Sequence, residues 1–186
     1  MGATLFEPRT RRWTREEYYR LAEEGWFEGQ RVQLIHGEII QMPPRGHAHA
    51  KALMVISRWL YDSLDKGHVV RIQMPLNAEA DSDPEPDAAV ASGPLESYRD
   101  HPTSALFVVE VADSSLKLDR EKEEVYAGSG VGEYWIVNVD ARQVEVYRDP
   151  DVNSRSYRTR TVYKEGERAA PLGLSLEKLE VARLFV

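Results

Sequence analysis

One acidic residue stands inside the most apolar run of the sequence. Glu110 lies within Phe107-Val-Val-Glu-Val111, a stretch typical of a strand that is buried on one or both faces. A carboxylate buried alone is costly, so we expect it to be protonated, paired with a cation or bound to a metal ion. The alternative is an edge strand on which Glu110 faces water.

A second acid, Asp87, follows Pro86 and opens a short apolar run over residues 87–91. Taken alone, an aspartate at the entrance of a strand is more often structural than functional. If the strands that carry Asp87 and Glu110 are neighbours, however, the two carboxylates can bind one hard cation, such as Mg²⁺ or Mn²⁺. Two negative charges in one site also predict raised carboxylate pKa values when no cation is bound.

Two further charged residues stand in apolar surroundings. Glu38 lies between large aliphatic residues in a predicted hairpin, where a solvent-facing position is an equally good interpretation. Lys122 shares the inward face of a predicted amphipathic helix with Val125 and Tyr126. A lysine there suits a cation held near a reacting oxyanion or an attacking water. The alternatives are a side chain that reaches past the helix end, or a structural Asp–Lys pair.

Several other groups carry weaker signals. His47 and His49 form a His-x-His pattern that could bind a metal, although His49 lies on an apolar helix stripe and a hydrogen-bonded core histidine is the better interpretation. Ser114 and Ser115 suit a turn and a helix start rather than a nucleophile, since no nucleophile elbow surrounds them. The alternating arginines of residues 155–160 could touch phosphates, but a solvated strand is favoured.

Composition excludes several classes of protein. The chain has 186 residues, no cysteine and a formal net charge of −7. Thiol nucleophiles and cysteine-based metal sites are therefore excluded, and we expect a cytoplasmic protein. No apolar run is long enough for a membrane span, and no glycine-rich phosphate loop supports a nucleotide cofactor. The acidic balance indicates that any nucleic-acid contact is confined to a local surface.

The charged residues must be positioned by an α/β fold of alternating helices and strands. Thr14 to Glu17 form a capping box that begins a helix ending near Gly25. We expect one domain over residues 1–186, with residues 1–12 as a flexible tail. The remaining predicted elements are a hairpin over residues 32–42, helices over 47–66 and 119–128, strands over 69–76, 87–91, 106–112, 133–139 and 143–148, and a strand pair around 157–163.

With Glu38, Pro86-Asp87, Glu110 and Lys122 in this order, the chain resembles the Uma-two family, whose members have the restriction-endonuclease-like PD-(D/E)XK fold. The resemblance runs from about Trp13 to the C-terminus. It rests on four blocks of sequence: Gln33-Leu-Ile-His-Gly-Glu-Ile-Ile40, Pro86-Asp87, Val109-Glu-Val-Ala-Asp-Ser-Ser115, and Tyr126-Ala-x-x-Gly-Val-x-Glu-Tyr-Trp-Ile-Val137. It implies a mixed central sheet flanked by helices, with an N-terminal helix and a β-hairpin.

The resemblance also implies roles for particular residues. Asp87 and Glu110 would hold a divalent metal together with the main-chain carbonyl of Val111, and Glu38 would be an acidic partner of that site. The general endonuclease motif has a lysine two residues after the second acid, where this chain has Ala112. Family members place the lysine on the following helix instead. Lys122 matches that position, with Lys117 as the fallback.

The function implied is a Mg²⁺-dependent deoxyribonuclease, with Mn²⁺ as a substitute, in which a metal-activated water attacks a DNA phosphodiester. The alternative is a catalytically silent module of the same fold that binds nucleic acid or a protein. A hydrolase for another substrate is a third interpretation, because fold does not fix function. Double-strand cleavage needs two active sites, so a homodimer is expected. Tyr134, Trp135 and Tyr147 could serve its interface, although core packing explains them equally well.

Overall fold

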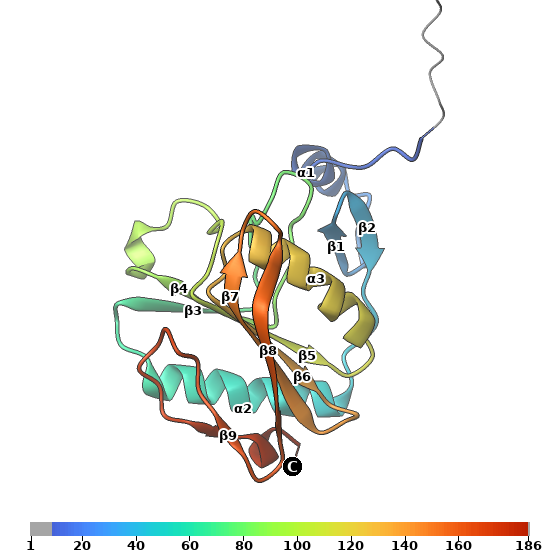
Figure 1. The fold of residues 1–186 in the computed structure, drawn as a ribbon. Helices are drawn as coiled ribbons and strands as arrows, with labels where there is room; N and C mark the ends of the chain where they lie inside the picture. The colour runs from blue at the N-terminus through green and yellow to red at the C-terminus, as the bar shows by residue number, and fades with distance from the viewer. Residues whose placement is uncertain (1–8, 186) are drawn as a thin grey trace, which may run out of the picture.

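A six-stranded mixed sheet forms the centre of the computed structural model, which describes residues 9–185 (Figure 1). The strands follow one another across the sheet in the order β3-β4-β5-β6-β7-β8. Only β5 and β6 run parallel; the other neighbours in this sheet are antiparallel. The bounds are β3 (His68–Ile72), β4 (Ala88–Ser92), β5 (Phe107–Ala112), β6 (Glu133–Asn138), β7 (Gln143–Asp151) and β8 (Ser156–Lys164).

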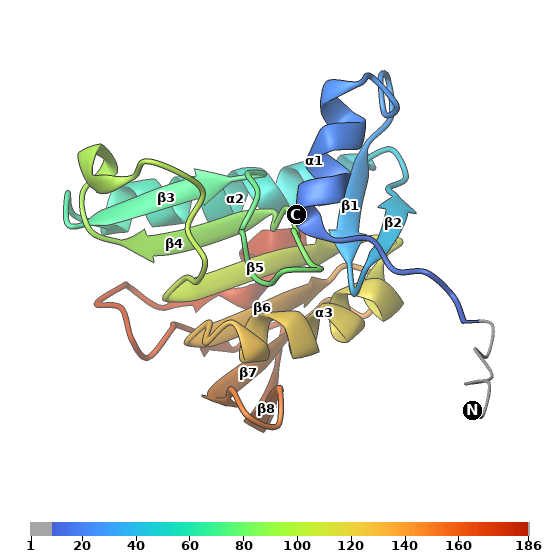
Figure 2. The same ribbon diagram turned by 90° about the horizontal axis from the view of Figure 1, so that it is seen from above.

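Two helices cover opposite faces of this sheet (Figure 2). Helix α2 (His47–Ser63) packs on one face, and α3 (Leu116–Gly128), which connects the parallel strands β5 and β6, packs on the other. Side chains of a strand point alternately to its two faces. Phe107, Val109 and Val111 of β5 therefore join the core cluster under α2. Glu110 points to the other face, towards α3, with which it shares a hydrogen bond.

The N-terminal elements lie beside one end of the sheet. Helix α1 (Arg15–Glu23) begins with the predicted capping box, in which Thr14 and Glu17 exchange side-chain to backbone hydrogen bonds. Strands β1 (Val32–Ile35) and β2 (Glu38–Gln41) form an antiparallel hairpin. Its turn residues His36 and Gly37 both have positive φ angles, of 49° and 72°. Such a turn matches the twist of a two-residue hairpin.

The hairpin is tied to the loop that leads into β4. The amide of Asp83 donates to the carbonyl of Leu34 at 2.7 Å, and the amide of Gly37 donates to the carbonyl of Asp81 at 2.7 Å. These bonds fix the acidic, proline-containing segment of residues 79–86 against a buried strand. Asp87 follows this segment directly, so its position depends on the hairpin.

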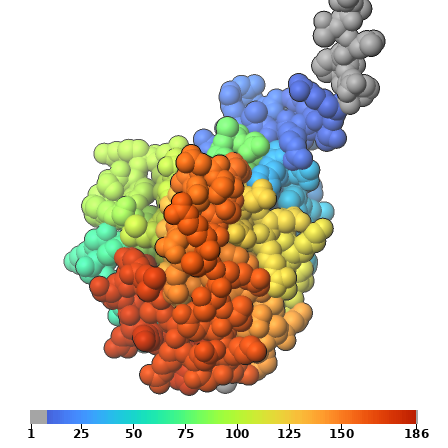
Figure 3. Space-filling model, in the orientation of Figure 1, coloured from blue at the N-terminus to red at the C-terminus, as the bar shows by residue number. Residues whose placement is uncertain are grey.

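The C-terminal segment closes the core on the side of α2. It contains β9 (Arg168–Ala169), β10 (Leu179–Glu180) and the 3₁₀ turn η2 (Val181–Phe185), while another 3₁₀ turn, η1 (Leu95–Ser97), follows β4. Val181 and Leu184 pack in the α2 cluster. In Figure 3 this red segment lies next to the orange β7–β8 segment.

The predicted α/β fold class is confirmed, and most element boundaries agree within a few residues. Three predictions need correction. The strand expected over residues 69–76 ends at Ile72, because Gln73 has a positive φ of 53°. The expected strand pair around 157–163 is the single strand β8, which pairs along the whole of β7. Helix α3 begins at Leu116 rather than Asp119, which adds a turn before the inward lysine.

Two further predictions concern a dimer interface and the N-terminal tail. Tyr134, Trp135 and Tyr147 are buried by 96% or more, so they belong to the core and offer no dimer interface. Of the tail expected over residues 1–12, residues 1–8 lie outside the described part, whereas Arg11 and Arg12 contact Glu17 and the carbonyl of His36. No helix among residues 9–185 combines the length and apolar character needed to cross a membrane.

Candidate functional site

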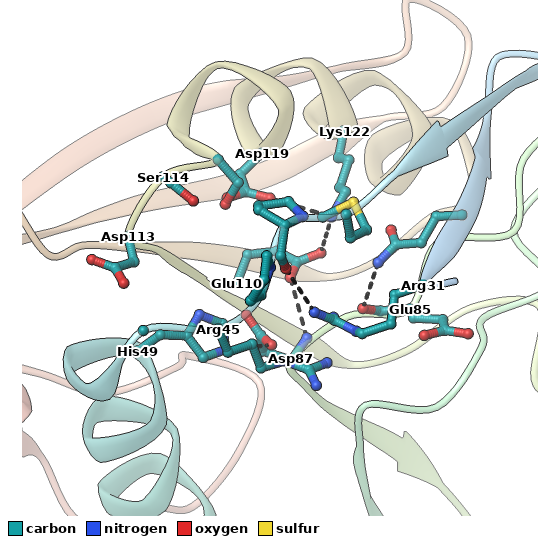
Figure 4. Close-up of a pocket in the computed structure, with 16 residues that line it drawn as sticks. Arg31, Arg45, His49, Glu85, Asp87, Glu110, Asp113, Ser114, Asp119 and Lys122 are labelled. Carbon is teal, nitrogen blue, oxygen red and sulfur yellow. Dashed lines mark hydrogen bonds and ion pairs between the residues drawn. The ribbon is translucent and has the colours of Figure 1, made fainter. Parts of the chain in front are cut away.

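A polar pocket lies between the N-terminal halves of α2 and α3, beside β5 and the residue that precedes β4 (Figure 4). The side chains in its wall are mostly polar or charged, which is unusual next to a core of aliphatic and aromatic side chains. The lining residues are Arg31, Gln33, Met42, Pro43, Pro44, Arg45, Gly46, His49, Glu85, Asp87, Glu110, Asp113, Ser114, Ser115, Asp119 and Lys122.

Asp87 is held in this pocket by groups from β5, from α2 and from the loop after β3. Its Oδ2 accepts a hydrogen bond from the amide of Val111 at 2.8 Å, and its Oδ1 accepts one from Gln73 Nε2 at 3.2 Å. His49 Nε2 lies 3.0 Å from the same Oδ1. Burial raises the pKa of Asp87, but the neighbouring His49 and these hydrogen bonds outweigh it and lower the pKa overall. The lowered pKa favours the ionised form of Asp87, which is the form that binds a cation.

Glu110 is the more deeply buried acid, with 3% of its surface exposed. The alternative of a water-facing edge strand is thus excluded. Its Oε1 accepts hydrogen bonds from Lys122 Nζ at 2.8 Å and from Tyr126 Oη at 2.7 Å, and its Oε2 accepts one from the amide of Asp87 at 3.2 Å. Burial raises the pKa of Glu110 to about 7, although Lys122 opposes the shift. The expected rise in carboxylate pKa occurs at Glu110 and not at Asp87.

Lys122 joins this acid to a third carboxylate. Its Nζ donates to Glu110 Oε1 and, at 3.2 Å, to Asp119 Oδ1, while Ser115 Oγ donates to Asp119 Oδ2 at 2.5 Å. Burial lowers the pKa of Lys122, but the two carboxylates outweigh burial and raise it above the usual value. Lys122 is therefore charged. Lys122 therefore fits two of the interpretations from the sequence: it reaches the acidic site, and it also forms an Asp–Lys pair.

Two arginines, Arg31 and Arg45, also line the pocket. Arg31 follows α1 and donates to the carbonyl of Pro43 at 3.0 Å, whereas Arg45 precedes α2 and forms no ion pair within residues 9–185. Burial and the nearby charge of Arg31 lower the pKa of Arg45. Two guanidinium groups in the wall of one pocket can bind an anionic group there.

Two predicted residues lie elsewhere. The structure does not bring Glu38 into this pocket: its side chain is 61% exposed on β2 and lies 3.3 Å from Arg12. Its alternation in the hairpin turns it towards solvent, which was the other interpretation. Lys117 is 93% exposed and lies 3.7 Å from Glu121, so the fallback lysine points away from the acids.

Val111 contributes through its backbone. Its amide donates to Asp87, and its carbonyl lies 3.0 Å from His49 Nδ1. The expected main-chain ligand therefore lies beside Asp87, where it already accepts from an imidazole.

Sequence reasoning missed several pocket residues. Asp119 had a usable signal, because it stands three residues before the inward Lys122 on one helix face. Arg31, Arg45 and Glu85 had none, since each lies in a loop or at an element end whose position depends on the packing of the hairpin.

The arginines of β8 and its turn do not form a free phosphate-binding face. Arg155 pairs with Glu79 at 2.6 Å, Arg158 with Asp151 at 3.0 Å, and Arg160 with Glu145 at 2.7 Å. Each guanidinium thus has a carboxylate partner, in line with the solvated strand that was favoured.

The donor atoms of the pocket fit a divalent metal only as a partial set. Carboxylates of Asp87 and Glu110 are ligands that Mg²⁺ and Mn²⁺ accept, and the buried Nε2 of His49 has no hydrogen-bond partner. In the described chain, however, no three His, Asp or Glu side chains converge as a complete metal site. Mg²⁺ is commonly bound through one or two carboxylates and completed by waters and phosphates, so an incomplete protein set is compatible with it.

Comparisons with known proteins agree with this architecture. A comparison with curated proteins gives no match. A solved structure from Anabaena variabilis, described as "a putative nuclease belonging to DUF820", matches with a TM-score of 0.72, covering 92% of this chain and 97% of that chain at 17% identity. At that identity the match shows the fold. The model of the Uma2 family, described as "Putative restriction endonuclease", matches residues 15–182. This chain, with its restriction-endonuclease-like fold, therefore belongs to the Uma2 family.

Proposed function

We propose that this protein is a metal-dependent endonuclease that hydrolyses DNA phosphodiester bonds. The observation that carries the proposal is the meeting of Asp87, Glu110 and Lys122 in one pocket. Hydrogen bonds join Asp87, which precedes β4, to β5, and join β5 to α3. Two acids and a lysine with these contacts suit the hydrolysis of a phosphate ester.

In this proposal Asp87 and Glu110 would hold Mg²⁺, or Mn²⁺ in its place. The carbonyl of Val111 is left out of the ligand set, because it already accepts from His49 Nδ1. Such an ion would lower the pKa of a water molecule and offset the negative charge of the phosphate. Glu38 has no part in the proposed site, because it pairs with Arg12 on the surface of the hairpin.

Lys122 would act on the phosphate or on the attacking water. An ammonium group has three N–H donors. Two of them are directed at Glu110 and Asp119, which leaves one for a substrate oxygen. Because Asp119 is itself fixed by Ser115, the lysine is positioned before substrate arrives.

The charges of the pocket support a polyanionic substrate that binds together with a metal. Arg31 and Arg45 in its wall can contact phosphates. The whole lining nevertheless contains five carboxylates against three Lys or Arg side chains. A phosphate would be repelled from the inner part of the pocket unless a cation were bound there, which supports metal dependence.

The test is cleavage of supercoiled plasmid and of single-stranded DNA in Mg²⁺ and in Mn²⁺. We expect the wild type to nick DNA, and Asp87→Asn and Glu110→Gln to lose about 10²–10⁴-fold in rate. Glu38→Gln and Lys117→Met are matched controls, because both residues are exposed and lie outside the pocket. They should cleave at the wild-type rate.

Other outcomes would separate the alternatives. If the wild type binds Mn²⁺ in calorimetry but cleaves no DNA, the nuclease proposal is wrong and another substrate is favoured. If it neither cleaves DNA nor binds metal, a catalytically silent binding module of this fold is the better interpretation.

We also propose a homodimer as the form that cuts both strands, because one active site cuts one strand at a time. Light scattering after size-exclusion chromatography measures the mass directly. A monomer that only nicks plasmid would contradict the dimer and leave the nuclease proposal intact.

A further inference from the structure

We propose that His49 is a side-chain ligand of the metal, through Nε2, beside Asp87. The inference rests on the proposed function, since it concerns the same metal site. It assigns to His49 a role beyond its contacts with Asp87 and the carbonyl of Val111.

The first observation fixes the proton on the histidine ring. His49 Nδ1 lies 3.0 Å from the carbonyl oxygen of Val111. A carbonyl only accepts, so Nδ1 must carry a hydrogen and donate it. In the neutral ring, Nε2 then carries the lone pair. Histidines that bind metals commonly donate their other N–H to a backbone carbonyl in this way, which orients the ring.

The second observation is that Nε2 is buried without a hydrogen-bond partner. It lies 3.0 Å from Asp87 Oδ1, an ion-pair contact that lowers the pKa of Asp87 and, against the effect of burial, raises the pKa of His49. A shared proton would have to lie near the line between nitrogen and oxygen. A metal ion lies to one side of that line. A metal ion that replaces this proton would gain one nitrogen and one oxygen ligand side by side.

The spacing agrees with this interpretation. Two ligands at right angles around an ion, with bonds of about 2.1 Å, are separated by about 3.0 Å. That is the separation of Asp87 Oδ1 and His49 Nε2. The remaining acid, Glu110, is turned to Lys122 and Tyr126, so it is the donor that must rotate to complete the set.

His49 is also held rigidly. It lies in the first turn of α2, and Ala52, Leu53 and Ile56 of that helix are buried in the core against the sheet. The carboxylate beside it is fixed by the amide of Val111. Moving His49 or Asp87 would disrupt core packing or a buried hydrogen bond, so the fold determines the separation between them.

An imidazole ligand has a consequence for metal choice. Oxygen ligands suit Mg²⁺, whereas a nitrogen ligand favours transition metals. The wild type should therefore prefer Mn²⁺ to Mg²⁺ more strongly than a variant that lacks the imidazole. We expect His49→Gln to weaken Mn²⁺ binding by about 10–100-fold and to affect Mg²⁺ less.

The experiment uses Mn²⁺ as the probe and needs no DNA. Electron spin-echo envelope modulation of the Mn²⁺-loaded wild type should show nitrogen coupling, and the pattern should change when histidine is labelled with ¹⁵N. His49→Gln should lose the coupling. His47→Gln is the matched control, since His47 lies two residues earlier on α2 and outside the pocket. This variant should keep the nitrogen coupling. Calorimetry gives the Mn²⁺ and Mg²⁺ affinities.

Bound Mn²⁺ without nitrogen coupling in the wild type would overturn the inference, as would the absence of Mn²⁺ binding. The wild-type spectrum decides the matter even if His49→Gln fails to fold. DNA cleavage measured in parallel separates the two proposals. Cleavage without nitrogen coupling supports the nuclease proposal and contradicts His49 as a ligand. Nitrogen coupling without cleavage supports His49 as a ligand and contradicts the nuclease proposal.

Discussion

Replacement of Lys122 by methionine removes the only cation that both Glu110 and Asp119 contact within residues 9–185. Methionine keeps most of the side-chain length and loses the charge. Removing one partner of a buried ion pair typically costs about 3–5 kcal/mol, because the other charge stays buried without compensation. We expect a loss of that size in the free energy of unfolding at pH 8.

The loss in the free energy of unfolding caused by Lys122→Met should be smaller in acid. The folded-state pKa of Glu110, about 7, lies above its ordinary value of 4.5. Its contribution to stability is therefore complete below pH 4.5 and is lost as the pH rises through 7. At about 1.4 kcal/mol per pH unit, the wild type loses roughly 3 kcal/mol from this group between pH 5 and pH 8.

Without Lys122 the pKa of Glu110 should rise beyond 8, because burial and Asp119 then act unopposed. The variant should then lose roughly 4 kcal/mol over the same interval, which is about 1 kcal/mol more than the wild type. Guanidinium unfolding followed by circular dichroism at pH 5 and pH 8 measures the difference, with Lys117→Met as the control because Lys117 is exposed. Equal losses at both pH values, or a variant within 1 kcal/mol of the wild type at pH 8, would refute the reasoning.

Three further predictions concern Tyr126, Glu145 and Arg45. Tyr126→Phe removes a donor to Glu110 and should cost about 1–3 kcal/mol in urea unfolding; unchanged stability would contradict the bond. Glu145→Gln removes the carboxylate that two arginines share; because their side chains are 45% and 47% exposed and stay solvated, it should cost about 1–3 kcal/mol at pH 7. Hydrogen bonds lower the pKa of Glu145 despite burial, so its stabilising effect is present above pH 4.5 and lost in acid. Thermal unfolding should therefore show a smaller difference from the wild type at pH 3. Arg45→Ala should reduce by about 1 the slope of log affinity for DNA against log salt, measured by fluorescence anisotropy. Arg58→Ala, on the exposed side of α2, should not; equal slopes for the two variants would remove Arg45 from the proposed interface.

Much of the fold could be predicted from the sequence, because its signals are local. The capping box at Thr14 satisfies backbone groups only three residues away, so its presence alone indicates a helix start. The apolar stripe that starts at His49 and the apolar run around Glu110 show the periods of a helix and a strand. The boundary errors occurred where a nonlocal contact decides, as at Gln73, whose amide donates to the carbonyl of Asp87.

The candidate site shows the same division. Glu110 and Lys122 could be identified because a charged residue in an apolar run or on an inward helix face contradicts its surroundings. The sequence could not decide whether Glu38 faced the site or the solvent, since alternation in a hairpin allows both. Only the packing of the hairpin turned it outward, towards Arg12.

Tertiary structure alone brought His49 to Asp87 and to the carbonyl of Val111, which is 62 residues away along the chain. It also placed Arg31 and Arg45 in the wall of the same pocket. Helix and strand periods reach only a few residues, so they determine which side chains share a face. They carry no information on which faces meet, and that depends on how α2, α3 and the hairpin pack around the sheet.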